Sequence, residues 1–523
     1  MKTFKIRKVR KLFSFRYLKW YISFIIIVGL GVALGLYKFN KNKPLCDKCN
    51  VILVSLDTLS ALHLPCYGYD KNTAPNLCAY ANKNVFFLNS YSNAPITLDS
   101  HFSIFTSLYP KSHKMTQVLG SPLEEKDLTL AQIFRRGGYQ TIYDGPNGVQ
   151  MPLELGIGRG FNSVYLREKS TDKWSVTYPE LLRNAEKNKP VFLFLHTYAV
   201  HAPFITGHKT KHLFTDIPEF PDIPLTEEEY KKITPEFINF ITDFVLQDPN
   251  RPSSSYQKVF GVIPEKYTKL AELNILLKEQ VKQSDEVKVI KKLKQTNDLK
   301  EAKKIFSTLS IETQEFSFSL WYTYDYIIHF KDNGLQRVQY LKALYDEQIY
   351  NLDNQLKELF KLMEDPRLSK NTILIITADH GEEFLEHGNM YHGSDLYRTQ
   401  TQVPLIMHIP GVSSIKVREL AQGIDIYPTA LAITNLQPKS PIEGIDLTEL
   451  IKGNLKHPTN KYIKSEFLGT TALQSGNWRL YYDDQKHRAT ELYNLTSDPV
   501  EQHNVISSYP EKVKEILIFR KQK

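Results

Sequence analysis

Short apolar runs separated by amphipathic segments constrain the fold of this chain more than any other feature. The runs lie at Asn50–Leu56, 139–143, 191–196, Thr372–Thr377 and 403–409. Their length and their Val, Ile and Phe content are typical of parallel strands that are covered on both faces. Between them, residues 128–137 and 341–363 have the pattern of amphipathic helices. This alternation predicts a layered α/β fold.

Two segments depart from the alternation. Residues 204–335 are rich in Lys, Glu and Tyr and have a helical pattern near 265–309, which predicts a helical insertion. The insertion is either a surface addition or a cap that shapes access to a site. After residue 460, short strand patterns with turn residues (WRLYYDD, then TELYNLTSDP) predict a small antiparallel subdomain over 460–523, following a main domain over 50–459.

The N-terminal segment predicts a membrane anchor. Residues 1–43 hold eleven Lys and Arg and no Asp or Glu, and the run WYISFIIIVGLGVALGLY at 20–37 is uncharged. A helix of about 20 residues spans a bilayer, and the excess of basic residues before the run places the N-terminus in the cytoplasm. We therefore expect a basic cytoplasmic tail (1–19), a transmembrane helix (20–37), a linker (38–49) and an extracytoplasmic body. A cleaved signal peptide is the alternative, which the long basic leader disfavours.

The charge distribution argues against nucleic acid as a partner. The whole chain has a formal net charge of +9, and residues 1–43 contribute eleven positive charges, so residues 44–523 sum to −2. A basic surface for nucleic acid is therefore not expected on the body.

Four cysteines occur, at positions 46, 49, 66 and 78. Cys46 and Cys49 form a C-x-x-C pair, but Cys66 and Cys78 are not spaced as the second pair of a zinc knuckle. Disulfides, either local or between the two pairs, and free thiols all remain open at this stage.

Acidic residues follow two of the apolar runs. Asp57 comes directly after Asn50–Leu56, and Asp379-His380-Gly381 comes just after Thr372–Thr377. Ligands in α/β sheets bind beyond the carboxyl ends of the strands, so these residues together predict one metal site. The alternative for Asp57 alone is a cap for a following helix.

The stretch ITLDSHFSIFTSLYP at 96–110 raises a second question. It places Thr97, Asp99, Ser100 and His101 in one short polar group ahead of an apolar segment. Thr97 is either the N-cap of a helix over 102–108 or a hydroxyl that attacks a substrate.

Five blocks together resemble the sulfatase family of the alkaline phosphatase superfamily. They are NVILVSLDTLSALHLPCYGYDKNTAPNL, APITLDSHFSIFTSLYPKSHKM, HTYAVHAPF, ITADHGEEFLEHGNMYHGSDLY with VPLIMHIPG, and ELYNLTSDPVEQHNV. The resemblance implies an α/β sandwich with one divalent metal (Ca, Mn, Mg or Zn) at the strand ends. The implied metal ligands are Asp57, Thr97, Asp379 and His380. The implied catalytic residues are Thr97, His101 and His201, and Ser100 and His392 are assigned to substrate binding.

This chain departs from the family pattern at several of those positions. Thr97 stands where sulfatases carry the Cys or Ser that is oxidised to formylglycine, and threonine cannot take that route. Asp99 replaces the motif's Pro, and His101 replaces its Arg. Thr58 stands at the position of the second metal aspartate, and YDGPNGVQ replaces the usual Gly-Lys-Trp-His segment.

These residues leave three hypotheses for function. The resemblance implies a membrane-anchored, metal-dependent hydrolase of sulfuric or phosphoric esters, with a glycan or a lipid head group as the bearer of the ester. The hydroxyl of Thr97 favours instead an in-line attack on phosphorus, in a phosphotransferase or phosphodiesterase of the cell envelope. The third hypothesis is a catalytically inactive glycan-binding protein. It would be favoured if Asp57, Thr97, Asp379 and His380 did not lie close enough together to bind one metal ion.

Overall fold

The computed structural model describes residues 44–115, 122–146, 151–166, 189–202, 204, 213–214, 235, 238, 285–296, 298–309, 330–454 and 462–520. The chain divides into two units, Met1–Leu45 and Cys46–Lys523, and the second is the subject here. Within the described ranges, no helix combines the length and the apolar character needed to cross a membrane. The expected tail (1–19) and anchor (20–37) lie outside these ranges. So does most of the 204–335 insertion, of which two helices, α11 (Asp285–Gln295) and α12 (Leu299–Phe306), are described.

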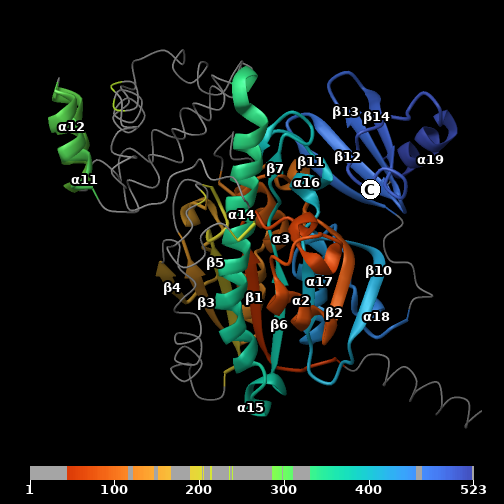
Figure 1. Cartoon of the computed structure of the whole chain (residues 1–523). Helices are drawn as coiled ribbons and strands as arrows, with labels where there is room; N and C mark the ends of the chain where they lie inside the picture. Colours follow the sequence, from red (N-terminus) through yellow and green to blue (C-terminus); the bar gives the residue numbers. More distant parts are fainter. Residues whose placement is uncertain are drawn as a thin grey trace, which may run out of the picture. The chain divides into compact units, whose positions relative to one another are not determined.

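An eight-stranded sheet forms the centre of the second unit (Figure 1). Its order is β10 (Ile415–Gln422), β2 (Val85–Tyr91), β9 (Leu405–His408), β6 (Thr372–Thr377), β1 (Asn50–Leu56), β5 (Val191–Thr197), β3 (Gln140–Gly145) and β4 (Ser163–Leu166). The prediction of a large, mostly parallel sheet is confirmed. The parallel direction expected for 403–409 is wrong, because β9 runs antiparallel to both β6 and β2. A buried apolar run carries no information about strand direction, which is set by how the chain between β6 and β9 returns to the sheet.

Helices cover both faces of the sheet. On one face, Leu193 and Leu195 of β5 share a hydrophobic cluster with Leu341 and Tyr345 of the long helix α14 (Phe330–Leu362). On the other face, Phe194 of β5 packs edge-on against Phe105 of α3 (Thr97–Thr106), with ring centroids 4.9 Å apart. Successive side chains of a strand point to opposite faces, and both faces are covered here, so the first five residues of β5 are all apolar. Figure 1 shows α14 running along the sheet over β1, β5 and β6.

A second, four-stranded sheet follows near the C-terminus. It consists of β11 (Ile463–Phe467), β12 (Thr470–Ser475), β13 (Trp478–Asp483) and β14 (Arg488–Asn494), all antiparallel, with helix α19 (Pro510–Arg520) after them. The prediction of an antiparallel C-terminal sheet is therefore confirmed. Buried Arg479 of β13 joins this sheet to the main one, because its Nη2 donates to Leu396 O and to Thr401 Oγ1.

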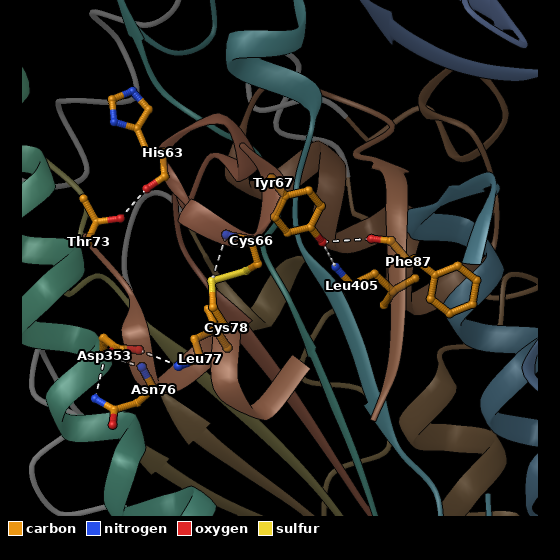
Figure 2. The surroundings of a disulfide bond; sticks show 10 residues. All are labelled: His63, Cys66, Tyr67, Thr73, Asn76, Leu77, Cys78, Phe87, Asp353 and Leu405. Atoms are coloured by element: carbon orange, nitrogen blue, oxygen red, sulfur yellow. Dashed lines mark hydrogen bonds between the residues drawn. A yellow bond between two sulfur atoms is a disulfide. The ribbon is translucent and has the colours of Figure 1, made fainter. Parts of the chain in front are cut away.

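The segment between β1 and β2 is held by one of two disulfides. The bonds join Cys46 to Cys49 and Cys66 to Cys78, which settles the pairing in favour of local bridges. Figure 2 shows the second bridge beside helix α2 (Pro75–Asn82), whose amides of Asn76 and Leu77 donate to Asp353 on α14. The disulfide and the carboxylate together tie the chain that leaves Asp57 to the helix layer.

Removal of the Cys66–Cys78 bridge should lower the free energy of unfolding by about 2–4 kcal/mol, because the bridge restricts the unfolded chain. The measurement is urea denaturation of a Cys66→Ser/Cys78→Ser double variant. Cys46→Ser/Cys49→Ser is the matched control, and it should cost less since its loop is shorter. Equal losses in the two variants would contradict this account.

Candidate active site

Two neighbouring parallel strands bring the predicted acids together. In β1 and β6, Ser55 pairs with Thr377, so Asp57 and Asp379 both lie just beyond the same edge of the sheet. Both carboxylates are fully buried, and so are Thr97 and His380. Asp57, Asp379 and His380 each present a potential ligand atom within 4.8 Å of the others. These three predicted ligands therefore lie close together at one end of the sheet.

Thr97 is not a helix cap. Helix α3 begins at Thr97 itself, its N-cap position is Ile96, and no side chain caps it. The Thr97 hydroxyl lies instead 3.5 Å from Asp57 Oδ2 and 3.2 Å from His380 Nε2. The helix expected over 102–108 starts five residues earlier because the polar first turn faces the buried acids. The N-terminal turn of a helix also favours anions near its backbone N–H groups.

The donor atoms fit a divalent metal. The Nδ1 atom of His380 lies 3.0 Å from the carbonyl of Gly381, so Nδ1–H donates there and Nε2 carries the lone pair that faces Thr97. Asp57 Oδ1 and Asp379 Oδ2 are buried and have no hydrogen-bond partner among the described residues. Ligands about 2.1 Å from one ion lie roughly 3–3.5 Å from each other. The contacts of Thr97 with Asp57 and His380 have this spacing.

The electrostatics of the two carboxylates also call for a cation. Burial raises the pKa of Asp57 well above its ordinary value, and repulsion from Asp379 and Glu382 raises it further. Burial also acts to raise the pKa of Asp379, but the neighbouring His380, His101 and His196 outweigh it and the net shift is downward. Two ionised carboxylates buried this close together need a nearby positive charge. A bound divalent ion would neutralise their charge.

Thr58 does not replace the missing second aspartate. Its Oγ1 donates to the carbonyl of Val200, and its backbone N–H donates to Asp379 Oδ1 at 3.1 Å. The residue has φ +58°, an unusual conformation for a β-branched side chain. Thr58 therefore orients Asp379 through its backbone while its hydroxyl points away from the acids.

His101 and Ser100 lie on the inner side of the site. The ring of His101 is fully enclosed, with Nδ1 2.8 Å from Thr97 O and Nε2 2.9 Å from Ser55 Oγ. Ser100 Oγ donates to the carbonyl of Asp379 at 2.6 Å. In this structure both side chains tie α3 to the ends of β1 and β6.

His201 and His392 lie on the outer side. Their rings are 5.0 Å apart, and His392 lies 4.3 Å from the ring of His380. Burial lowers the pKa of His392 to about 4, so its ring is neutral near pH 7. Its Nδ1 shares a 2.9 Å hydrogen bond with Glu382. All the residues predicted for the site therefore lie in one continuous group.

His196 was not anticipated from the sequence. It is the sixth residue of β5, pairs with Ser55 in the parallel register, and is buried with its Nε2 3.0 Å from Asp57 Oδ2. The available signal was a single polar residue at the end of the run VFLFLH. Without the register of β1 and β5, that residue cannot be distinguished from the end of a strand.

A cavity of about 230 Å³ lies between the loop after His392 and the C-terminal sheet. Its walls include Ser394, Asp395, Tyr397, Phe467, Tyr481 and Glu491. The neighbouring Gly393 lies close to Ile96, the residue before Thr97, and a Cβ on it would be 3.7 Å from that side chain. The C-terminal sheet thus takes part in the surroundings of the site.

Asp395 should make stability depend on pH. Burial, with repulsion from Glu383, raises its pKa from 3.8 to about 7. Between these pH values the folded chain binds a proton that the unfolded chain does not, so the contribution is full below pH 3.8 and is lost as the pH rises through about 7. In denaturant titrations at pH 5 and 8, wild type should lose more stability over this interval than Asp395→Asn. Equal losses would contradict the assignment.

Comparison with known proteins identifies the family. The family model described as Sulfatase matches residues 49–436. The chain belongs to the sulfatase family. Arylsulfatase K of Mus musculus is 24% identical over 93% of this chain and 81% of the relative, and that of Homo sapiens is 25% identical over 88% and 80%. The match to arylsulfatase K of Gallus gallus, 29% identical, covers 35% of this chain and 36% of the relative, about a third of its length.

Solved structures of other proteins share the fold of this chain. The structure of BT4656 in complex with its substrate D-glucosamine-2-N,6-O-disulfate has a TM-score of 0.63 at 19% identity, covering 90% of this chain and 97% of that one. The phosphonate monoester hydrolase of Agrobacterium radiobacter has a TM-score of 0.59 at 17% identity, covering 91% and 96%. The expectation of a sulfatase-family ester hydrolase is confirmed at the level of family and fold.

Proposed function

We propose that this sulfatase-family chain is a metal-dependent hydrolase of sulfuric or phosphoric esters in which the Thr97 hydroxyl is the nucleophile. The position of that hydroxyl carries the proposal, because it lies beside Asp57 and His380 and makes no capping bond. Asp57, Asp379, His380 and Thr97 would hold one divalent metal ion. A bound ion lowers the pKa of a hydroxyl and screens charge on the attacked group.

The attack uses groups that the chain itself supplies. Thr97 Oγ1 forms a bond to phosphorus or sulfur as the bond to the leaving oxygen breaks, which gives a covalent Thr97 ester. Asp57 Oδ2, 3.5 Å from the Thr97 hydroxyl, is within reach to accept its proton, because the Nε2 lone pair of His380 would be occupied by the metal whereas Asp57 has a second oxygen, Oδ1, to offer the ion. The N-terminal turn of α3 favours the negative charge of the anion through the helix dipole.

The outer histidines serve the leaving group. His201 is half-buried and its ring lies 5.0 Å from that of His392, and we assign it to protonate the leaving oxygen. His392 is neutral near pH 7, and Glu382 fixes its ring, which suits it to orient the ester rather than to donate a proton. Water then attacks phosphorus or sulfur, the bond to Thr97 Oγ1 breaks, and the hydroxyl is restored.

The chemistry at Thr97 favours phosphorus over sulfur. A formylglycine hydrate has two hydroxyls, so one can expel the sulfate that the other has accepted. Thr97 has one hydroxyl and depends on water to release the group. The retained metal-site residues argue against the inactive glycan-binding alternative.

A panel of esters tests the function. The full-length chain in detergent micelles is stripped with EDTA, resupplied with single divalent metals, and assayed with p-nitrophenyl sulfate, p-nitrophenyl phosphate and bis-p-nitrophenyl phosphate. We expect metal-dependent turnover, with phosphorus esters preferred. Turnover that EDTA does not affect would overturn the metal-dependent mechanism, and turnover of the sulfate alone would overturn the preference for phosphorus.

We also propose that residues 20–37 anchor the chain and that the catalytic unit is extracytoplasmic. The two disulfides support this, since such bonds persist in oxidising compartments and are rare in the cytosol. Protease added to intact cells should degrade the catalytic unit while a tag on residue 1 stays protected. Protection of both would overturn the topology.

A further inference from the structure

The site contains one buried nitrogen that the proposed mechanism does not use. His196 has a relative exposure of 2%, and its Nε2 lies 3.0 Å from Asp57 Oδ2. Its other nitrogen, Nδ1, has no hydrogen-bond partner in the part of the chain that the structure describes. A buried polar atom without a partner is costly, so this side chain is retained for some interaction that the apo chain does not satisfy.

Two carboxylate oxygens near His196 are also buried without a hydrogen-bond partner among the described residues. They are Asp57 Oδ1 and Asp379 Oδ2. His196, His101 and Asp379 form a group whose potential ligand atoms lie within 4.8 Å of one another, and this group shares Asp379 with the Asp57, Asp379 and His380 group. The residues that carry these unpaired atoms, His196, Asp57 and Asp379, therefore lie together, and Asp379 belongs to both groups.

The members of this group differ in how free they are to bind. Both nitrogens of His101 already have partners, Thr97 O and Ser55 Oγ, so its ring is committed to the scaffold. It packs on His196, with ring centroids 4.6 Å apart, and limits how that ring can turn. His196 alone has a nitrogen to spare. Because Nε2 lies 3.0 Å from Asp57 Oδ2 and donates there, Nδ1 is the nitrogen left to bind an ion.

The residue after Asp57 offers no ligand to the site. Thr58, in the position after Asp57, turns its hydroxyl to Val200 O. We propose that His196 is a further ligand of the single metal ion proposed above, and that it makes the site selective for Zn²⁺ or Mn²⁺ over Ca²⁺. The inference rests on the proposed metal-dependent function. Calcium takes oxygen ligands, whereas imidazole suits first-row transition metals, and this donor set would contain two imidazoles, from His196 and His380.

Metal binding by the full-length chain in detergent tests this without reference to turnover. The EDTA-stripped protein is titrated with Zn²⁺, Mn²⁺ or Ca²⁺ by calorimetry, and the bound metal is counted by elemental analysis. We expect one ion per chain and an affinity for Zn²⁺ or Mn²⁺ at least about 100-fold above that for Ca²⁺. Stronger binding of Ca²⁺ would overturn the proposal, and so would two ions per chain, which would assign His196 to a separate site.

Two substitutions separate a ligand from a positioning residue. His196→Ala removes both the ring and its hydrogen bond to Asp57, while His196→Gln can still donate to Asp57 but offers no imidazole nitrogen. If His196 is a ligand, both variants should bind Zn²⁺ at least about 10- to 100-fold more weakly, with a smaller change for Ca²⁺. Affinity restored in His196→Gln would show that His196 only positions Asp57, and would overturn the proposal.

The matched control is His113→Gln, because His113 is also a buried histidine but bonds Ser103 Oγ away from the acids. It should bind Zn²⁺ as wild type does, and circular dichroism checks that every variant is folded. The Co²⁺-loaded chain gives a second readout, since its visible absorption should change in His196→Gln and not in the control. A wild-type chain that binds no metal at all refutes the proposed function as well. One that binds a metal and turns over esters, but is unaffected by His196→Gln, refutes this inference alone.

Discussion

Replacement of Thr97 by alanine should lower kcat for ester hydrolysis by about 10⁴- to 10⁶-fold, because the attacking atom is removed. The fold should persist, since the Thr97 side chain makes no cap and its hydroxyl contacts only the side chains of Asp57 and His380 among the described residues. The measurement is steady-state turnover of the best ester from the panel, at saturating metal, with the thermal midpoint of unfolding recorded for each variant.

Thr97→Ser is the matched control for this result. Serine keeps a hydroxyl on the first turn of α3, so it should retain activity within about 100-fold of wild type. Mass spectrometry of wild-type chain quenched with acid should find phosphate or sulfate on the peptide that contains Thr97. Ester turnover that survives in Thr97→Ala would show that the hydroxyl only positions other groups.

Replacement of Arg479 by alanine should give the largest loss of stability, about 3–5 kcal/mol, because it leaves a buried charge without its partner. Arg479 has a relative exposure of 1%, and its Nε lies 3.4 Å from Glu501 Oε1. The same guanidinium also donates to Gln474 and to the carbonyl of Leu396. Urea denaturation of the full-length chain measures the effect.

Two further substitutions give this prediction its controls. Arg479→Lys keeps the charge but loses the forked geometry, so an intermediate loss is expected. Lys486→Ala removes an exposed cation that pairs with Asp483, and it should cost less than about 1 kcal/mol. If Arg479→Ala costs no more than Lys486→Ala, the buried cation does not hold the two sheets together.

The parts of this molecule that the sequence predicts well are those with local signals. The apolar runs mark β1 and β6, and the acids directly after them meet at one sheet edge because parallel neighbours end together. The C-terminal hairpins are visible from turn residues. Two features depend on contacts between distant segments. The antiparallel direction of β9 is one, and the pairing of Ser55 with His196, which carries that histidine to Asp57, is the other.

The start of α3 shows why local rules fail at the site itself. A threonine ahead of an apolar segment is typical of an N-cap, and on a solvated helix that interpretation would hold. Here the first turn is buried between two strand ends, so Ile96 takes the cap position and the polar side chains point to partners far away in the chain. Ser100, for example, bonds the backbone of Asp379, 279 residues later.

The contacts of the C-terminal sheet have a consequence for biosynthesis. Two residues hold the segment that follows His392 in place. Arg479 donates to the carbonyl of Leu396, and Glu501 accepts from the amide of Arg398. A ribosome makes Asp57 and Thr97 first and these supports almost last. During synthesis, the nascent chain therefore carries the residues of the site before Arg479 and Glu501, which hold the segment after His392, have been made. Full competence arrives only when the final strands have emerged and docked.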